Sequence, residues 1–508
     1  MNAVPKGWIK TTLESCVDIR NFEREPINSS EREDRINGKN PDDLFGYYGA
    51  TGKVGLIDDY RSEGERVLLG EDAAPFLDQH KDKAYLVRGK FWVNNHAHVL
   101  YGASGMVNNA FVCHQLNTTD YRPFVTGSTR LKLTGAAMKQ IPLLLAPAAE
   151  QTRIVEKLEE LLSDLDAGVA ELKAAQRKLG QYRQSLLKAA VEGALTAQWR
   201  AQHTPTETGA QLLERILTER RARWEAKQLA KFEAQGKAPP KDWRKKYPEP
   251  VRPDTSELPA LPEGWAWASL DQFLYQLRSG TAETSGRDAT EFPVLKSSAV
   301  RQGHIDWEAL NYLESHQIRE DNSLEEGDIL ITRLSGSVEY VGCCAIAGKI
   351  PEIGIQYPDR IFCGKLSLRD KEIASYLMHC LFSPQARIII EAAAKSTAGH
   401  KRISLSDLLP FPIPLPPESE LKVICNQIAD SLDQIRETGK AVEISLKQSA
   451  AQRKNILKAA FSGQLVPQDP DDEPAAVLLE RIRAERVSSA GGRGRKGRPA
   501  ASDRSHAC

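Results

Sequence analysis

The chain has 508 residues, in which 68 Lys and Arg residues are balanced by 68 Asp and Glu residues. This length is enough for about three domains, and the neutral balance excludes the globally basic composition of many nucleic-acid-binding proteins, so any such binding must use local patches. No apolar leader opens the chain and no window approaches about eighteen apolar residues, so we expect a soluble, cytoplasmic protein without a membrane span.

Residues 1–146 are predicted to form a mixed α+β domain, because they are rich in aromatic and β-branched residues and punctuated by Gly and turn residues. Residues 66–69 and 91–93 are strand candidates. Polar side chains in the loops can pair with base edges or phosphates. The candidates for DNA contact are Tyr47, Tyr48, Thr51, Lys53, Asn94, Asn95, His96, His98, Thr126, Ser128, Thr129 and Arg130. Taken one at a time, each residue also fits an ordinary solvated polar loop, or a surface histidine whose hydrogen bonds are already made. The residues alone favour that structural interpretation over DNA contact.

Residues 147–200 are predicted to form the first long helical region. Pro147 lies near its start and Gly193 just past its end, the usual asymmetry of helix ends. A leucine recurs there at every seventh position, which is typical of a coiled-coil seam. The seam positions are Leu158, Leu165, Leu172, Leu179 and Leu186. The alternative is an amphipathic helix packed on its own domain, but leucines in strict register drift off one face of a straight helix.

Residues 201–261 are predicted to form a basic helix followed by a Pro-rich linker. The stretch 215–246 interleaves Lys and Arg with Trp224, Phe232 and Trp243, so it suits docking to DNA or to a partner protein. A solvated helix and linker is an equally open interpretation. The prolines between 239 and 262 exclude a continuous helix there.

Residues 262–416 are predicted to form the second mixed domain. Residues 328–332 and 341–347 are strand candidates, and 377–394 is predicted as a helix interrupted near Pro384. Its candidates for DNA contact are Arg333, Ser335, Ser337, Lys395, Ser396, Thr397, His400, Lys401 and Arg402. The same plainer interpretation applies to each of them.

Residues 417–466 are predicted to form the second long helical region. Its residues equivalent to the leucine seam include Ile428, Ile435, Val442 and Ile456. A whole domain separates the two helices, which leaves room for parallel or antiparallel pairing. We predict an α+β fold class, with two mixed domains separated by two long helices that form an antiparallel coiled coil. Residues 467–486 are predicted as a repeated C-terminal helix and residues 487–508 as a disordered basic tail.

Several blocks occur twice, which indicates a duplication. The positions Pro142, Leu145, Pro147, Glu150 and Ile154 reappear as Pro412, Leu415, Pro417, Glu420 and Ile424. Residues 187–190 and 457–460 share Leu-Lys-Ala-Ala, and residues 212–216 and 478–482 share Leu-Leu-Glu-Arg-Ile. Each half also opens alike, with Trp8 and Trp265 in the same short block. We therefore expect two globular domains, each followed by the same helical element.

Motifs of catalysis are not found in the sequence. Residues 49–54 resemble a phosphate loop, but the glycines are too close and Lys53 is followed by Val54 rather than Ser or Thr. His96 and His98 lack a third nearby metal ligand, and the eight cysteines form no C-x-x-C pair, which favours reduced thiols. We expect no enzyme activity, no metal and no cofactor in this chain.

At the repeated blocks the chain resembles the specificity (S) subunits of Type I restriction-modification systems. Residues 142–155, followed by the heptad helix and by residues 187–196, are similar to the family's conserved helical region. Residues 412–417 through 459–465 are similar to its second helical region. Gly327-Asp328-Ile329-Leu330 and the openings at Trp8 and Trp265 resemble its target-recognition domains.

The resemblance implies that each domain reads one half of a split, asymmetric double-stranded DNA site while the helices set the spacer. It also implies two modification (M) subunits that bind along the helices and supply S-adenosylmethionine-dependent adenine-N6 methylation. Restriction (R) subunits would supply ATP- and Mg-dependent translocation and cleavage. The alternatives are a coiled-coil adaptor that holds two protein-binding domains apart, and an autonomous nuclease or methyltransferase, which the missing motifs disfavour.

Overall fold

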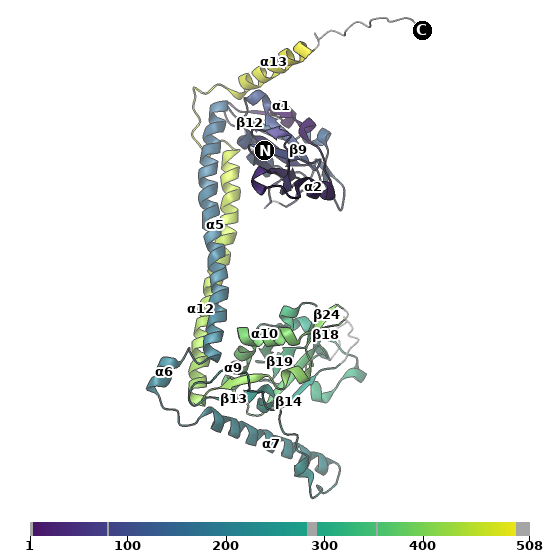
Figure 1. Cartoon of the computed structure of the whole chain (residues 1–508), viewed down its shortest axis with the longest axis vertical. Helices are drawn as coiled ribbons and strands as arrows, with labels where there is room; N and C mark the ends of the chain where they lie inside the picture. The colour runs from purple at the N-terminus through teal and green to yellow at the C-terminus, as the bar shows by residue number, and fades with distance from the viewer. Residues whose placement is uncertain (1–3, 79–80, 282–291, 352–353, 398, 494–508) are drawn as a thin grey trace, which may run out of the picture. The chain divides into compact units, whose positions relative to one another are not determined.

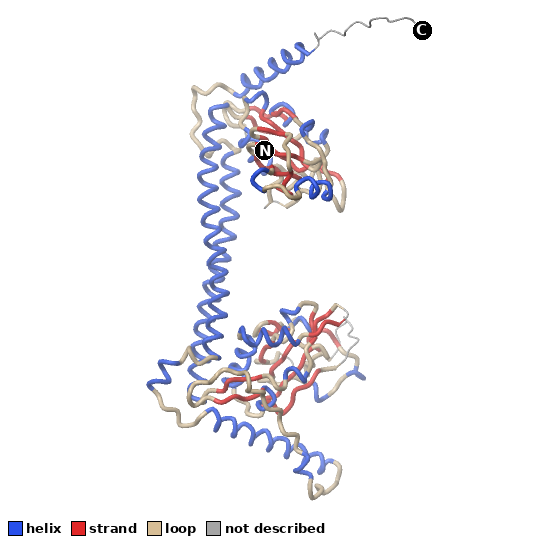
Figure 2. Tube along the Cα trace, viewed as in Figure 1, coloured by secondary structure: helices blue, strands red, loops and turns tan. Residues whose placement is uncertain are grey.

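The computed structural model describes residues 4–78, 81–281, 292–351, 354–397 and 399–493. It divides into two compact units, one made of residues 1–174 and 442–508 and the other of residues 175–441. Each unit contains a globular domain of strands and helices together with parts of the two long helices α5 (Ala148–Val191) and α12 (Glu418–Ala460) (Figures 1 and 2). The predicted fold class is confirmed.

The globular domain of the first unit is built on two four-stranded sheets. One has the strand order β2-β9-β6-β7 and the other the order β4-β3-β8-β5. Its strands are β1 (Ile9–Thr12), β2 (Val17–Ile19), β3 (Phe45–Gly49), β4 (Gly52–Ile57), β5 (Ser62–Glu63), β6 (Arg66–Gly70), β7 (Ala84–Val87), β8 (Lys90–Val93), β9 (Ala97–Gly102), β10 (Val125–Thr126), β11 (Lys132–Leu133) and β12 (Pro142–Leu145). The predicted strands at 66–69 and 91–93 are confirmed as β6 and β8.

Short helices close this domain over its core. They are α1 (Leu13–Cys16), η1 (Asn21–Glu23), α2 (Ser29–Ile36), η2 (Pro41–Asp43), η3 (Ala103–Gly105), α3 (Asn109–Thr118) and α4 (Gly135–Lys139). Buried apolar residues of β6, β9 and α3, such as Leu69, Leu100 and Leu116, share one core. All five residues of β6 are buried, because Val67 and Leu69 pack in one hydrophobic cluster and Leu68 packs in another.

The globular domain of the second unit has a main sheet that repeats the strand order of the sheet β2-β9-β6-β7 in the first. Its main sheet has the order β14-β22-β19-β21. Its strands are β13 (Ala266–Ser269), β14 (Leu274–Ser279), β15 (Pro293–Leu295), β16 (Val300–Arg301), β17 (His304–Ile305), β18 (Leu310–Tyr312), β19 (Ile329–Thr332), β20 (Leu334–Ser335), β21 (Cys344–Ile346), β22 (Ile361–Leu366), β23 (Lys395–Thr397), β24 (His400–Arg402) and β25 (Pro412–Leu415). The predicted strands at 328–332 and 341–347 correspond to β19 and β21.

The helices of the second domain include the interrupted pair that the sequence predicts. The helical elements are α8 (Leu270–Phe273), η5 (Ser297–Ala299), η6 (Ser315–Gln317), η7 (Glu320–Asn322), η8 (Val338–Tyr340), α9 (Lys371–Phe382), α10 (Pro384–Ala393) and α11 (Leu405–Leu408). Pro384 separates α9 from α10 because it stands at the first position of α10, where its missing N–H is harmless. The Ser383 hydroxyl caps the new helix by accepting a bond from the backbone N–H of Ala386.

In each domain the first strand pairs with the last. β1 pairs with β12 in antiparallel register, Ile9 opposite Leu145, and β13 pairs with β25, Ala266 opposite Leu415. This pairing brings the opening tryptophan of the domain to the start of the long helix that follows. As a result, the indole N–H of Trp8 donates to Glu150 over 2.9 Å in the first unit.

In each unit α5 and α12 lie side by side in opposite directions (Figure 1). In the first unit, Ile154 and Leu158 near the start of α5 share a cluster with Ala460 at the end of α12. In the second unit, Leu187 near the end of α5 shares a core with Ile424 near the start of α12. The pairing at both ends is therefore antiparallel.

Among the predicted seam residues, burial is greatest near the two ends of α5. Leu158 and Leu186 are buried, and Leu165, Leu172 and Leu179 are half-buried. On α12 the equivalent residues divide differently, because Ile428 near the start and Val442 in the interior are buried while Ile435 and Ile456 are half-buried.

The segment between the halves folds back on itself. It contains α6 (Ala197–Gln202), α7 (Gly209–Ala234) and η4 (Trp243–Lys246). The Trp224 ring stacks on Trp243 with 5.7 Å between centroids, and Phe232 meets the edge of Trp243. These three rings pack on one another and hold the linker against α7.

Most of the arginines of this segment also have partners within the second unit. Arg220 is buried and donates to the carbonyl oxygens of Leu274 and Pro248, and Arg244 pairs with Glu225. A local structural role therefore accounts for the aromatic and arginine pattern of α7.

The helix α13 (Ala475–Arg493) packs on the first domain, and its residues Leu478, Leu479 and Ile482 belong to the core that contains Leu13 and Leu143. The helix continues past residue 486, so the disordered tail predicted from residue 487 is corrected for residues 487–493. Residues 475–490 lack Pro and Gly, which favours a helix past residue 486, and the helix ends just after Gly491 and Gly492. The rest of the predicted tail, residues 494–508, lies outside the described residues.

Candidate nucleic-acid interface

Three loops of the first domain meet where strands of the sheet β2-β9-β6-β7 begin or end: the loops after β2 and β6 and the loop before β9. β6 ends at Gly70, which pairs with Ala97 at the start of β9, so residues 71–72 and 94–96 lie at the same edge. β2 runs antiparallel to β9, with Ile19 opposite Leu100, so residues 20–24 emerge at that edge too. We call residues 20–24, 71–72, 94–98 and 130–132 the polar edge.

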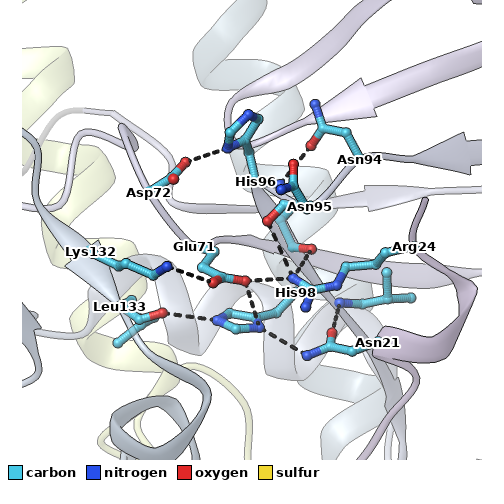
Figure 3. A network of polar contacts seen from close by, with 12 residues as sticks. Asn21, Arg24, Glu71, Asp72, Asn94, Asn95, His96, His98, Lys132 and Leu133 are labelled. Atoms are coloured by element: carbon cyan, nitrogen blue, oxygen red, sulfur yellow. Dashed lines mark hydrogen bonds and ion pairs between the residues drawn. The ribbon is translucent and has the colours of Figure 1, made fainter. Parts of the chain in front are cut away.

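His98 lies at the centre of the polar edge and is only 1% exposed (Figure 3). The Asn21 side chain is oriented by its oxygen, which accepts from the backbone N–H of Val99, so its amide nitrogen donates to Nδ1 of His98 over 3.1 Å. The neutral ring then carries its proton on Nε2 and donates it to the Leu133 carbonyl oxygen over 3.0 Å. Burial lowers the pKa of His98 below its usual 6.5, which keeps the ring neutral.

Glu71 is the charged member of the polar edge. Burial opposes its ionisation, but the hydrogen bond from Arg24, at 2.5 Å, and the nearby positive charges outweigh burial and hold its pKa below the usual value. Lys132 lies 3.4 Å from the other carboxylate oxygen. Arg24 also donates to the Ala97 carbonyl oxygen over 3.2 Å. The ionised carboxylate thus ties three loops of the edge together.

Asp72 brings together two candidates that are far apart in the sequence. Its Oδ1 lies 2.7 Å from Nδ1 of His96 (Figure 3). The same oxygen lies 3.2 Å from the Arg130 guanidinium. Asn94 supports the turn before His96, since its side-chain oxygen accepts from the His96 backbone N–H over 2.8 Å. Asn95 is exposed. The edge therefore presents amide, imidazole and guanidinium groups, which suit base edges and phosphates.

The hairpin β10–β11 extends this edge. Thr126 pairs with Lys132, and the exposed loop between them carries Ser128, Thr129 and Arg130. Its turn requires glycine at position 127, because φ is +99° and a Cβ there would lie 2.5 Å from the Arg130 carbonyl oxygen. A further bridge joins Lys132 to Asp72. The hairpin is thus fixed to the polar edge while its hydroxyl and basic side chains face solvent.

The turn between β3 and β4 lies next to the same edge. The Asn94 backbone N–H donates to the Tyr48 carbonyl oxygen over 2.9 Å, and the half-buried Tyr48 ring packs on Phe91. Thr51 and Lys53 are exposed in and just after this turn. The segment joins two strands rather than a strand and a helix, so its geometry also differs from that of a phosphate loop.

Three predicted contact residues are buried. Asn94 is 8% exposed, and its side-chain oxygen accepts from the His96 backbone N–H. Tyr47 is 2% exposed, and its hydroxyl bonds the backbone N–H and carbonyl of Ile27. His98 is fully occupied by Asn21 and Leu133. These buried side chains therefore support the loops through their internal hydrogen bonds. Alternation along β3 turns Tyr47 inward, because neighbouring strand residues point to opposite faces. In β9 residues on both faces are buried, so His98 is covered with its neighbours.

In the second domain a small sheet gathers most of the predicted residues. β20, which carries Ser335, pairs with β24, and β24 pairs with β23. Lys395 lies opposite Arg402 and Ser396 opposite Lys401, and Thr397 lies opposite His400. The side chains of Lys395, His400 and Arg402 are exposed, and Ser337 is half-buried. Ser335 and Lys401, which are also half-buried, therefore lie within one basic surface.

Arg333 anchors this small sheet to the main one. Its backbone N–H donates to the Arg360 carbonyl oxygen and its guanidinium to the Asp359 carbonyl oxygen over 3.0 Å. The guanidinium carbon lies 5.5 Å from the centre of the Phe362 ring. Arg333 is thus partly committed to holding the loop, and the hairpin β23–β24 carries the more exposed basic groups.

The two basic hairpins occupy the same place in the two domains. β10–β11 is followed by α4 and the closing strand β12, and β23–β24 is followed by α11 and the closing strand β25. Each hairpin also lies beyond the end of a central strand, β6 or β19, since Asp72 bridges to Lys132 and Ile403 bonds to Arg333. The duplication has therefore kept a basic hairpin at one edge of each sheet.

Sequence reasoning missed Asn21, Arg24, Glu71, Asp72 and Lys132. No motif marks them, and only the register of β2, β6 and β9 brings them together.

Within the described ranges no group of three or more His, Cys, Asp or Glu side chains is arranged to hold a metal ion. None of the helices in the described part of the chain has the length and apolarity needed to cross a membrane.

Comparison with known proteins relates this chain to one family. The family model for the Type I restriction modification DNA specificity domain matches residues 5–174. The Type I restriction enzyme EcoKI specificity subunit of Escherichia coli is 27% identical over 399 residues, which cover 76% of this chain and 74% of that protein. The StySPI specificity subunit of Salmonella potsdam is 23% identical over 401 residues, covering 75% and 72%.

A solved structure from a study of the assembly and conformational transition of the type I R-M system shares the fold. It matches with a TM-score of 0.58 at 15% identity, covering 91% of this chain and 100% of that one.

A putative type I specificity subunit of Haemophilus influenzae is 38% identical over 149 residues, which cover 29% of this chain and 36% of that protein.

Proposed function

Because the chain belongs to the specificity subunits of Type I restriction-modification systems, we propose that each of its globular domains reads one half of a split, asymmetric double-stranded DNA site. The observation that carries this proposal is the pair of basic hairpins, β10–β11 and β23–β24, at equivalent edges of the two sheets. Two equivalent reading surfaces with different side chains suit two half-sites of different sequence.

The chemistry of each surface divides into positioning and reading. Exposed Lys53, Lys395 and Arg402 contact phosphates, which supply affinity and salt dependence but no sequence information. Asn95 and Arg130 reach base edges, since an amide pairs with adenine and a guanidinium with guanine. The local clusters explain how an electrically neutral chain binds DNA.

The paired helices set the distance between the two half-sites. α5 contains 44 residues, which correspond to about 66 Å at about 1.5 Å per residue. One turn of B-DNA is about 34 Å long, so a helix of this length matches about two turns. The leucine seam resists sliding of one helix along the other.

Catalysis belongs to partner subunits. Two modification subunits bind along α5 and α12 and methylate adenine N6 with S-adenosylmethionine, and restriction subunits use ATP and Mg to translocate and cut. The specificity chain contributes the choice of site and holds no cofactor of its own.

Methylation-sensitive long-read sequencing tests the proposal. DNA from cells that carry this chain with its modification subunit is compared with DNA from cells that lack only this chain. We expect a split methylated motif that depends on the chain. A stable complex that adds no motif would instead support a protein adaptor or an inactive system.

A further inference from the structure

Phe22 is an apolar side chain in an unusual position. It occupies the middle of η1, directly after β2, and its side chain is 72% exposed. Among the described residues between 4 and 147, it is the only aromatic residue that is exposed to this extent. Removing a phenyl ring from water lowers its free energy. This exposed ring lies in segment 20–24 of the polar edge, so a ligand bound at that edge would cover it.

The backbone around Phe22 is held on both sides. Asn21 bonds His98 and the backbone N–H of Val99. Glu23 is buried, accepts from the Ser62 hydroxyl over 2.7 Å and from Arg66 over 3.1 and 3.2 Å. The ring is therefore presented on a rigid turn, and little conformational entropy is lost when it meets a ligand.

The surroundings of the ring favour an anionic, aromatic ligand. The Arg20 guanidinium carbon lies 5.4 Å from the ring centroid, and Arg24 belongs to the same turn. Arg20 pairs with Glu23 through Nε over 2.5 Å, while its side chain stays 36% exposed. Through Glu71, Arg24 is connected to the polar edge that carries Asn95 and His96. DNA offers both phosphates for the arginines and flat bases for the phenyl ring.

We propose that Phe22 places its ring against a base step of the half-site read by the first domain and is a specificity-determining residue of that domain. This inference rests on the proposed DNA-reading function. The ring acts as an apolar wedge or stacking platform, while Arg20 contacts the adjacent backbone phosphate. Asn21 and Glu23 are positioning residues, since they act through the turn.

The test uses the complete complex with its modification subunits and a duplex that carries the motif found by sequencing. Phe22→Ala is compared with Phe22→Trp and with Ile388→Ala, a control at a 71% exposed apolar residue of the second domain. We expect Phe22→Ala to weaken cognate binding about ten-fold, the usual scale for losing one base–aromatic contact, with unchanged melting temperature and unchanged binding to a random duplex. Phe22→Trp and Ile388→Ala should bind like the wild type.

A 2-aminopurine scanned through the first half-site supplies a second readout. Its fluorescence should change on binding of the wild type at one step and fail to change with Phe22→Ala. Cognate affinity of Phe22→Ala within two-fold of the wild type, with no 2-aminopurine difference, overturns the inference while leaving the DNA-reading function intact. A wild-type complex that prefers no duplex overturns both.

Discussion

At the residue scale, the duplication places a buried glutamate at the start of each long helix but gives the two different surroundings. Glu150 and Glu420 each accept from a tryptophan indole over 2.9 Å. Glu420 also pairs with Arg200 and accepts from the Thr196 hydroxyl over 2.6 Å. No described residue forms a salt bridge with Glu150, and burial raises its pKa above the usual 4.5 against the opposing bond from Trp8.

These surroundings predict opposite outcomes for the same substitution. The folding stability linked to Glu150 is present below pH 4.5 and is lost as pH rises through its raised folded pKa. Glu150→Gln should therefore remove the loss of stability that accompanies ionisation of the glutamate. The unfolding free energy at pH 7 should be unchanged or higher. Glu420→Gln leaves Arg200 without its counter-charge and should cost about 2 kcal/mol. Denaturant unfolding of the full chain between pH 4 and 8 measures both, and equal effects would contradict the assignment.

At the element scale, the repeated Leu-Leu-Glu-Arg-Ile block closes each unit with a helix. Ile216 of α7 is buried in the core of the second domain, and Ile482 of α13 is buried in the core of the first. Truncating a buried isoleucine to alanine costs about 2–5 kcal/mol. We expect Ile216→Ala to lower hydrogen-exchange protection in residues 266–415 only, and Ile482→Ala in residues 9–145 only. Loss of protection in both units from one substitution would contradict this division.

The coiled-coil seam gives a second prediction at this scale. Leu165→Asp places a charge in the partly buried seam and should abolish methylation at all sites alike, because an unpaired charge is costly to bury. Ala167→Asp, on the exposed side of the same helix, is the matched control and should retain activity. Methylation by the assembled complex is the measurement. Full activity of Leu165→Asp would refute the spacer role of the seam.

At the scale of the whole molecule, the two domains are predicted to work independently. Replacing residues 266–410 with the equivalent domain of a relative should change one half of the methylated motif and keep the other half and the spacer. The reason is that the hairpin β23–β24 and its supporting sheet lie entirely within that segment. Long-read sequencing of methylated DNA reports the motif directly, and a change in both halves would refute independent reading.

The sequence by itself determined the duplication, the two long helices, the α+β class and the strands around residues 66–70 and 329–332. These follow from local patterns, because heptad spacing, helix-end residues and β-branched runs depend on neighbours along the chain. Sequence also pointed to the hairpin residues near 130 and 401, since their composition alone marks polar, basic loops.

Only the tertiary structure decided which of those residues face outward. Strand register turned Tyr47 and His98 into the interior and joined Asp72 to His96 and Arg130. It also packed Trp224 on Trp243, although the sequence left these rings available for a ligand. A side chain's neighbours across a sheet come from distant parts of the chain, so no local pattern specifies whether it supports the fold or meets a partner.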